Sequence, residues 1–268
     1  MHNLIDYISQ KIVNAELFNN PFKHFEINDL IPEKHYKSFI CALPKITLYN
    51  PLAHRDAFKQ GCATRFELSL SFENRHLEID RIFSKNKTAT DIVDAFCSER
   101  FKSLLLDKFE STLEVTPYPH LYKDLAGFHP PPHTDIVEKA ITFGWYLPEN
   151  ALFKDSGLGL FTKTSCEFKE VKRIPYTPNK AFAFLRSSDS WHGVRHSPST
   201  SYERNSLFVT FYRRNHYSNG SVLVSDPNLD RKEDDLLIDC MKINSSVILI
   251  IDHAGSLLGA AHKQALST

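Results

Sequence analysis

Hydrophobic residues in the first part of the chain recur at helical spacing. Between Leu4 and Leu17 the apolar positions are three or four residues apart, which predicts an amphipathic helix that ends before Asn19. A second helix is expected after Pro32, with its apolar residues on one face, and Pro44 is expected to end it. The chain therefore begins with two predicted helices.

A shorter period appears at residues 65–72, where apolar and polar side chains alternate. This alternation predicts a strand with one buried face. From Thr88 to Thr112 the helical spacing returns and predicts one long helix, with Thr90 as its cap. The first 116 residues are thus expected to combine helices with a strand.

From about Pro117 the pattern changes to short apolar runs separated by clusters of Pro, Gly, Asn and Ser. Such runs are typical of the short strands of a β-sandwich or barrel. The predicted strands are residues 118–123, 140–147, 158–161, 181–185 and 206–213. The fold class is therefore expected to be mainly β with flanking helices.

The remaining tail carries a predicted helix near residues 233–242 and an apolar segment at 246–251. No internal repeat or clear linker divides the sequence. We therefore expect residues 1–268 to form a single domain, in which 117–214 is the β core, 1–116 is a part of helices and strand that precedes it, and 215–268 is a C-terminal extension.

The charge balance narrows the possible partners. Lysine plus arginine equals aspartate plus glutamate, at 32 residues each, so a broad basic field for nucleic acid or a membrane surface is not expected. A small-molecule or protein partner is expected instead, and a small-molecule substrate is favoured. The N-terminus does not resemble a secretory signal, and the apolar run Val247–Ile251 is far shorter than the roughly 20 residues of a membrane span. A cytoplasmic protein is expected.

The five cysteines contain no Cys-x-x-Cys pair. They fit neither a disulfide framework nor a zinc finger, and they are expected to be reduced thiols. Candidate chemistry lies instead in the histidines, of which there are thirteen. The informative ones are those with a carboxylate at a spacing that allows both side chains to reach one point.

His133 and Asp135 have this spacing, because residues two apart on a strand point to the same side. A third ligand is expected further along the chain, and His192 follows 57 residues after Asp135, next to Gly193. The glycine permits a close backbone approach. Two imidazoles and one carboxylate leave about three coordination positions open, which is typical of iron(II) oxygenases. Zinc prefers a closed tetrahedral site.

A cationic anchor for an organic acid is also present. Arg204 and Ser206 are two residues apart in a predicted strand, so both can face one pocket. A guanidinium binds a carboxylate through two parallel hydrogen bonds, and a hydroxyl can add a third. These residues are therefore candidates for binding a dicarboxylic co-substrate.

Together these motifs resemble the 2-oxoglutarate and iron(II)-dependent oxygenase superfamily, nearest its prolyl-hydroxylase-like branch. The matching residues are His133-x-Asp135, 139–148, Gly157-Leu158-Gly159-Leu160, 190–194 and Arg204-x-Ser206, within 117–214. The resemblance implies a double-stranded β-helix, or jelly roll, with N-terminal helices. It also implies that His133, Asp135 and His192 bind iron, and that Arg204 binds the distal carboxylate of 2-oxoglutarate.

Two departures from the family pattern concern the turn at Ser156-Gly157, where relatives have a glycine pair, and Arg204, where many prolyl-hydroxylase relatives have lysine. Asp135 bears on the reaction, because halogenating relatives have lost this carboxylate. The resemblance thus implies hydroxylation or another oxidation, in which oxygen and 2-oxoglutarate are consumed and succinate and carbon dioxide are released.

Several alternatives stay open. The substrate of a hydroxylase is either a small metabolite, such as an amino acid, a natural-product intermediate or a sugar derivative, or a prolyl or similar side chain of a protein. A non-catalytic jelly-roll binding protein and a zinc hydrolase are further alternatives. Tyr122 either hydrogen-bonds the co-substrate or packs in the core. His129 competes with His133 as a ligand, and Lys139 is a carboxylate binder, a substrate contact or an exposed lysine.

Overall fold

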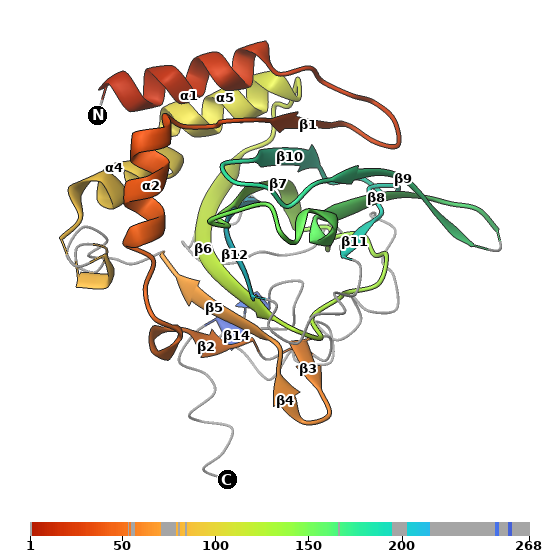
Figure 1. The fold of residues 1–268 in the computed structure, drawn as a ribbon. Helices are drawn as coiled ribbons and strands as arrows, with labels where there is room; N and C mark the ends of the chain where they lie inside the picture. The colour runs from red at the N-terminus through yellow and green to blue at the C-terminus, as the bar shows by residue number, and fades with distance from the viewer. Residues whose placement is uncertain are drawn as a thin grey trace, which may run out of the picture.

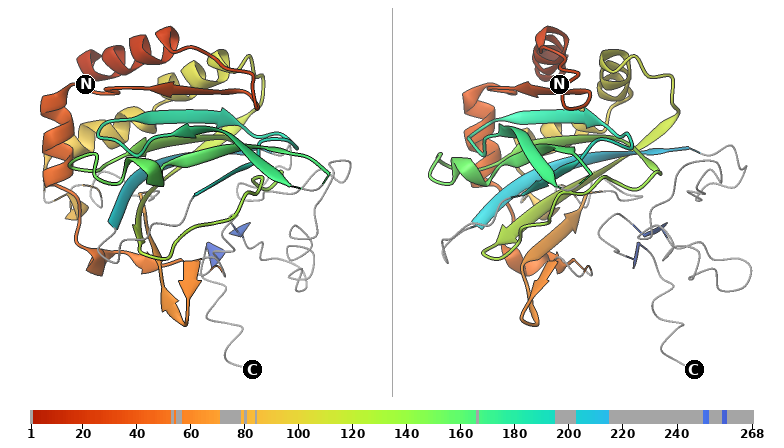
Figure 2. Two further views of the ribbon diagram at one scale, coloured as in Figure 1. Left: turned by 45° about the vertical axis from the view of Figure 1, so that its right-hand side comes forward. Right: turned by 90° about the vertical axis from the view of Figure 1, so that its right-hand side faces the viewer.

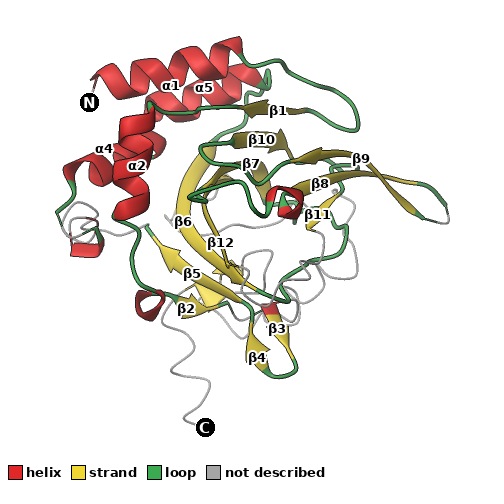
Figure 3. Ribbon diagram, in the orientation of Figure 1, coloured by secondary structure: helices red, strands yellow, loops and turns green. Residues whose placement is uncertain are grey.

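The computed structural model describes residues 2–52, 54, 57–70, 79, 81–83, 85–165, 167–194, 203–214, 250–251 and 257–258. Four helices precede the main β region: α1 (His2–Asn14), α2 (Glu33–Cys41), α4 (Lys87–Phe96) and α5 (Glu99–Lys108). They gather on one side of the strands (Figure 3). The two helices expected at the start of the chain are confirmed by α1 and α2.

The expected single helix from Thr88 to Thr112 is wrong, because the chain breaks between α4 and α5. The hydroxyl of Ser98 accepts a hydrogen bond from the backbone N–H of Phe101 at 3.1 Å, and this N-cap starts a new helix. Thr90 is also not the cap of α4. The Asn86 side chain takes that role and accepts from Ala89 N–H at 3.1 Å.

The largest sheet is antiparallel and has seven strands in the order β1-β10-β7-β12-β6-β5-β2. Its strands are β1 (His24–Ile27), β2 (Asn50–Pro51), β5 (Arg65–Ser69), β6 (Val115–Leu125), β7 (Lys139–Tyr146), β10 (Ala181–Leu185) and β12 (Glu203–Arg213). The long curved strands β6 and β12 run through its middle (Figure 1). Strands from both the first 116 residues and the predicted β core therefore build one sheet.

A smaller sheet lies against this one and contains β11 (His192–Val194), β8 (Leu158–Lys163) and β9 (Phe168–Ile174), in that order. An antiparallel bridge between His133 and His192 adds one more segment beside β11. Buried apolar residues of both sheets, including Leu160, Phe182 and Phe184, pack between them. The expected mainly β fold with a jelly-roll core is confirmed.

The short elements are η1 (Ile46–Leu48), η3 (Lys154–Ser156), a hairpin of β3 (Phe58–Lys59) and β4 (Cys62–Ala63), and a pair formed by β13 (Ile250–Ile251) and β14 (Leu257–Leu258). The predicted helix near 233–242 lies outside the described residues. Within the described chain, no helix has the length and apolar character to cross a membrane.

The helices cover the outer face of the large sheet, away from the smaller sheet (Figure 2). Phe143 and Trp145 of β7 point to this outer face, with Phe101 5.0 Å from Phe143 and Phe96 5.6 Å from Trp145, measured between ring centroids. Such aromatic contacts add to the free energy gained by burying the rings. The alternate residues of β7, including Tyr146, face the space between the sheets, where the polar candidates lie.

Candidate metal centre and co-substrate pocket

His133 and His192 are brought together through their backbones. The N–H of His133 donates to the carbonyl of His192 at 2.9 Å, and the N–H of His192 donates to the carbonyl of His133 at 2.8 Å. The ring centroids are 4.5 Å apart. A Cβ at Gly193 would lie 3.0 Å from the Pro130 carbonyl oxygen, so the glycine allows the segment before His133 to approach β11 closely.

Both imidazoles are oriented in the same way. Nδ1 of His133 lies 2.8 Å from the Pro131 carbonyl oxygen, and Nδ1 of His192 lies 2.9 Å from the Ser190 carbonyl oxygen. A carbonyl can only accept, so Nδ1 of each ring carries the hydrogen and Nε2 carries the lone pair. Hydrogen bonds of this kind fix the tautomer of metal-binding histidines. Each ring is therefore prepared to bind a metal through Nε2.

The Asp135 carboxylate is held in place by two neighbours. Lys139 Nζ lies 3.2 Å from Oδ1, and the Thr142 hydroxyl donates to Oδ2 at 3.0 Å. The His192 Nε2 atom is 4.0 Å from the same Oδ2. One ligand atom each from His133, Asp135 and His192 lies within 4.8 Å of the others, so one cation can contact all three.

The protonation states of the two histidines also suit a metal. Burial and, to a smaller extent, the neighbouring His192 lower the pKa of His133 to about 3. Burial likewise lowers the pKa of His192. Both rings are therefore neutral near pH 7, which is the form that binds a metal. His129 does not join this group, because its Nδ1 lies 2.6 Å from the Gly127 carbonyl oxygen and the described metal-ligand cluster excludes it.

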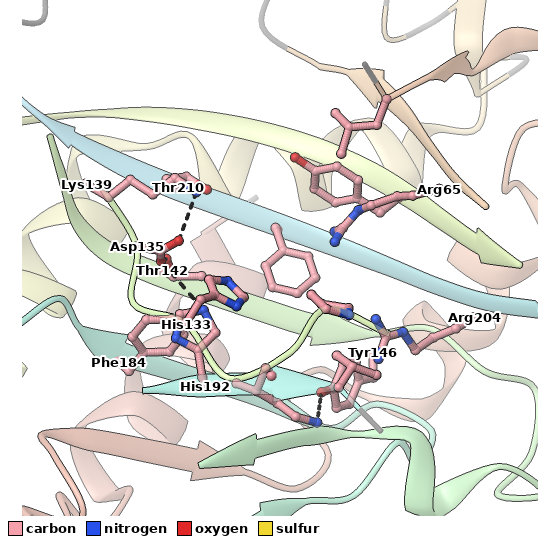
Figure 4. Close-up of a pocket in the computed structure, with 17 residues that line it drawn as sticks. Arg65, His133, Asp135, Lys139, Thr142, Tyr146, Phe184, His192, Arg204 and Thr210 are labelled. Atoms are coloured by element: carbon pink, nitrogen blue, oxygen red, sulfur yellow. Dashed lines mark hydrogen bonds and ion pairs between the residues drawn. The ribbon is translucent and has the colours of Figure 1, made fainter. Parts of the chain in front are cut away.

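The three candidate ligands lie at one end of a cavity of about 110 Å³ between the two sheets, and Arg65 and Arg204 lie at the other end (Figure 4). About 10–15 Å³ of such volume holds one water, so the cavity has room for a small organic acid. Aromatic and aliphatic residues form much of the wall between the two ends: Tyr122, Tyr146, Leu158, Phe184, Val194 and Phe208. The cavity thus joins a metal-binding end to a cationic end.

Arg204 lies in this cavity, but a carboxylate of the protein already pairs with it. Its Nε and Nη2 donate to Oδ2 of Asp124 at 2.9 and 2.6 Å, and its Nη1 donates to the Ser156 carbonyl at 2.7 Å. Asp124 is fully buried, and Arg204 is 3% exposed. The guanidinium is therefore fixed in position, and its charge is largely balanced by Asp124.

Ser206 lies two residues further along β12, between Tyr122 of β6 and Tyr146 of β7 in the register of the sheet. Ser206 is fully buried, and its Oγ has no hydrogen-bond partner among the described residues. It shares a strand face with the cavity residues Arg204 and Phe208. A buried hydroxyl in this position fits a polar ligand, because an unsatisfied buried group is unfavourable. Tyr122 lines the cavity, as expected for either of its predicted roles.

Sequence reasoning missed several residues of the site. Tyr146 lines the cavity, and its phenol oxygen accepts from Leu158 N–H at 2.8 Å. Arg65 lies in the cavity wall although it precedes the predicted core by about fifty residues. Its position at the start of an alternating strand was the available signal. Lys139 is mostly buried and pairs with Asp135, so an exposed lysine is excluded.

No protein-family model matches the sequence, and no curated protein matches it. Among solved structures, a prolyl-4-hydroxylase from Pseudomonas putida is similar, with a TM-score of 0.51 and 14% identity over 79% of this chain and 100% of that chain. A prolyl hydroxylase from Trichoplax adhaerens, in complex with a hypoxia-inducible factor oxygen degradation domain peptide, has a TM-score of 0.47 and 13% identity, covering 78% of this chain and 90% of its own.

The non-haem α-ketoglutarate-dependent epimerase SnoN from nogalamycin biosynthesis has a TM-score of 0.49 and 9% identity, covering 85% of this chain and 96% of its own. At such low identity the likeness concerns the fold alone, and among these three structures only the Pseudomonas putida enzyme has a TM-score above 0.5. Its whole length is covered by the chain described here. This chain therefore has the fold of the Pseudomonas putida prolyl-4-hydroxylase, with the jelly-roll core that the sequence resemblance predicted.

Proposed function

We propose that this protein is an iron(II) and 2-oxoglutarate-dependent dioxygenase that hydroxylates an unactivated C–H bond, with oxygen as the second co-substrate and succinate and carbon dioxide as products. One observation carries the proposal. The two Nε2 atoms and the Asp135 carboxylate meet at one end of a cavity whose other end is cationic. An acid that chelates a metal and ends in a second carboxylate fits both ends.

The donor set suits iron(II). Two neutral imidazoles and a carboxylate would hold the ion from one side, as in the facial arrangement of non-haem iron oxygenases. When bound, iron(II) supplies the redox chemistry that activates oxygen, which side chains cannot provide. The protein's own contribution is to hold His133 and His192 as neutral ligands and to fix Asp135 through Lys139 and Thr142.

The opposite end suits the distal carboxylate of 2-oxoglutarate. Arg204 is held by Asp124 with its guanidinium in the cavity wall, and the Ser206 hydroxyl is buried nearby on the same strand face. The Tyr122 phenol forms part of the same wall. Charge-assisted hydrogen bonds in a mostly apolar cavity select an acid of the right length and exclude water from its middle.

A second, wider hollow adjoins the cavity and shares Pro130 and Val194 with it. Aromatic and proline residues line this hollow, and two of them, Phe58 and Phe168, are 43% and 39% exposed. The substrate is proposed to bind here, next to the metal ligands. We favour a small metabolite with an apolar part as the substrate. We also propose that the enzyme is cytoplasmic.

One observation favours the second candidate, a hydroxylase of protein side chains. The helices cover the outer face of the large sheet, so they do not close the hollow. An open groove with exposed aromatic residues also suits an extended peptide. The two candidates are separated by measuring succinate release with panels of amino acids and small metabolites and, separately, with proline-containing peptides.

The first test of the function is an anaerobic titration of the purified protein with iron(II) and then 2-oxoglutarate. The expected result is a weak visible charge-transfer band that requires both additions and is absent in His192→Ala. The Asp135→Gly variant should not hydroxylate. If metal binds tightly with no response to 2-oxoglutarate, the binding-protein or hydrolase alternatives replace the oxygenase.

A further inference from the structure

Three charged side chains form a row across adjacent strands at the end of the cavity away from the metal ligands. Arg65 of β5 is in register with Asp124 of β6, and Asp124 is in register with Arg204 of β12. Both arginines line the cavity, and Figure 4 shows them on the side opposite His133 and Asp135. The cationic end therefore contains two guanidinium groups.

The two arginines differ in how they are bonded. Arg204 donates twice to Oδ2 of Asp124 and once to a backbone carbonyl. Arg65 Nε lies 3.4 Å from the other carboxylate oxygen, Oδ1. Neither this Nε nor this Oδ1 makes a hydrogen bond within the part of the chain that the structure describes. Asp124 thus binds Arg204 closely and only orients Arg65.

Aromatic rings hold the Arg65 guanidinium in position. Its central carbon lies 3.9 Å from the ring centroid of Tyr122 and 4.5 Å from that of Phe128. Cation–π contacts of this kind restrain a guanidinium without using its N–H groups. The Arg65 side chain is 16% exposed, so it lies mostly out of bulk water. A restrained, partly desolvated guanidinium with its donors available is well suited to bind a carboxylate.

The net charge at this end of the cavity can be balanced by one anion. Two guanidinium groups and the Asp124 carboxylate sum to one positive charge. One further carboxylate would neutralise the group, and its two oxygens would accept hydrogen bonds from Arg65. The distal carboxylate of a 2-oxo diacid supplies this charge, whereas a 2-oxo acid ending in a methyl group does not.

We propose that Arg65 binds the distal carboxylate of the co-substrate together with Arg204, and that Arg65 determines the preference for 2-oxoglutarate over 2-oxo acids that lack this group. This inference rests on the proposed function and assigns a specificity residue to strand β5. Arg204, which already pairs with Asp124, contributes a second guanidinium to the binding of this carboxylate.

The test compares two ligands on one metal-loaded protein. The dissociation constants of 2-oxoglutarate and of 2-oxopentanoate, which ends in a methyl group, are measured anaerobically from the charge-transfer band of the iron(II) protein. In Arg65→Met, affinity for 2-oxoglutarate should fall by about 30-fold or more, as expected for a lost charge-assisted pair. Affinity for 2-oxopentanoate should stay within about twofold, since Arg65 has no carboxylate to bind there.

Arg100→Met serves as the matched control, because Arg100 pairs with Asp6 and is half exposed. Its two dissociation constants should equal those of the wild type. If Arg65→Met weakens both acids equally, or changes neither, Arg65 does not read the carboxylate and the inference is overturned. If Arg65→Met does not fold, Arg65→Gln decides, because glutamine removes the charge and keeps a polar side chain, and an unchanged ratio between the two acids contradicts the inference.

Failure of the proposed function gives a different result. In that case wild-type protein loaded with iron(II) binds neither acid as a chelate, and no band appears in any variant. Binding measured by calorimetry with manganese(II) in place of iron(II) repeats the comparison without turnover. If Arg65→Met reduces the preference for 2-oxoglutarate over 2-oxopentanoate in both measurements, the specificity is assigned to Arg65.

Discussion

The backbones of His133 and His192 hydrogen-bond to each other in both directions, although the two residues are 59 positions apart in the sequence. The pairing fixes the spacing of two imidazoles before any metal binds. Since Nδ1 of each ring is also held by a carbonyl, the metal-binding end is organised by the chain itself.

Replacing a ligand histidine should remove metal binding. His192→Ala deletes one of three donor atoms while leaving its backbone bonds to His133 intact, so the fold should persist. We expect iron(II) affinity to fall by more than about 100-fold. Calorimetric titration of the apo-protein measures this change. His129→Ala is the matched control and should keep wild-type affinity, because His129 lies nearby without joining the cluster. Equal losses in both variants would contradict the assignment.

Thr142→Val tests the support of Asp135. The substitution keeps the shape of the side chain and removes the hydroxyl that donates to Oδ2. Supporting hydrogen bonds of metal ligands are worth about 10- to 100-fold in affinity, so iron(II) affinity should fall by roughly tenfold. Thr162→Val on β8 is the control, and it should leave the affinity unchanged. Unchanged binding in Thr142→Val would show that the Thr142 hydroxyl does not orient the carboxylate.

The buried Asp124 carboxylate should contribute strongly to stability. Asp124→Leu leaves Arg204 buried without its anion, which typically lowers the free energy of unfolding by about 3–5 kcal/mol. The double variant with Arg204→Met removes both charges, so it should be more stable than Asp124→Leu alone. Urea denaturation of the wild type, of Asp124→Leu, of Arg204→Met and of the double variant measures the coupling free energy between the two residues. A double variant less stable than either single variant would argue against a paired role.

Stability of the apo-protein should fall as the pH decreases from 6.5. Burial lowers the pKa of His133 to about 3, so the folded state binds fewer protons than the unfolded state between pH 6.5 and 3. At pH 5 the unfolded state gains about 2 kcal/mol from this residue, because each pKa unit is worth about 1.4 kcal/mol. Urea denaturation at pH 7.5 and 5.0 should show a smaller decrease in His133→Asn. An equal decrease in both proteins would exclude His133 as the cause.

Much of the core could be predicted from the sequence, because strands with one buried face alternate and central strands are apolar throughout. The runs at 140–147 and 181–185 correspond to β7 and β10. Helical spacing alone missed the break between α4 and α5, since apolar residues continue across it and only the capping contact of Ser98 marks the boundary. The three-residue strand β11 is too short to carry a periodic signal.

Some residues of the candidate site could also be predicted from local sequence spacing, and others could not. A spacing of two residues identified His133 with Asp135, and Arg204 with Ser206. Arg204 and Ser206 lie on β12, where residues two apart share a face, whereas His133 forms an isolated bridge and Asp135 lies outside the strands. Contacts across strands left no such signal. The pairing of Asp124 with both Arg65 and Arg204 depends on the register of β5, β6 and β12, which the local pattern does not determine. Arg65 was therefore found only once the strands were placed side by side.

The row of Arg65, Asp124 and Arg204 has a consequence for dissecting the protein by truncation. A fragment that begins after residue 116 would retain all three candidate metal ligands, yet it would lose β5 and with it one of the two arginines. Asp124 would also become the edge of the sheet instead of lying between two paired strands. The metal ligands thus come from residues 133–192, whereas the cationic end of the cavity depends on a longer stretch of chain, from residue 65 to residue 204.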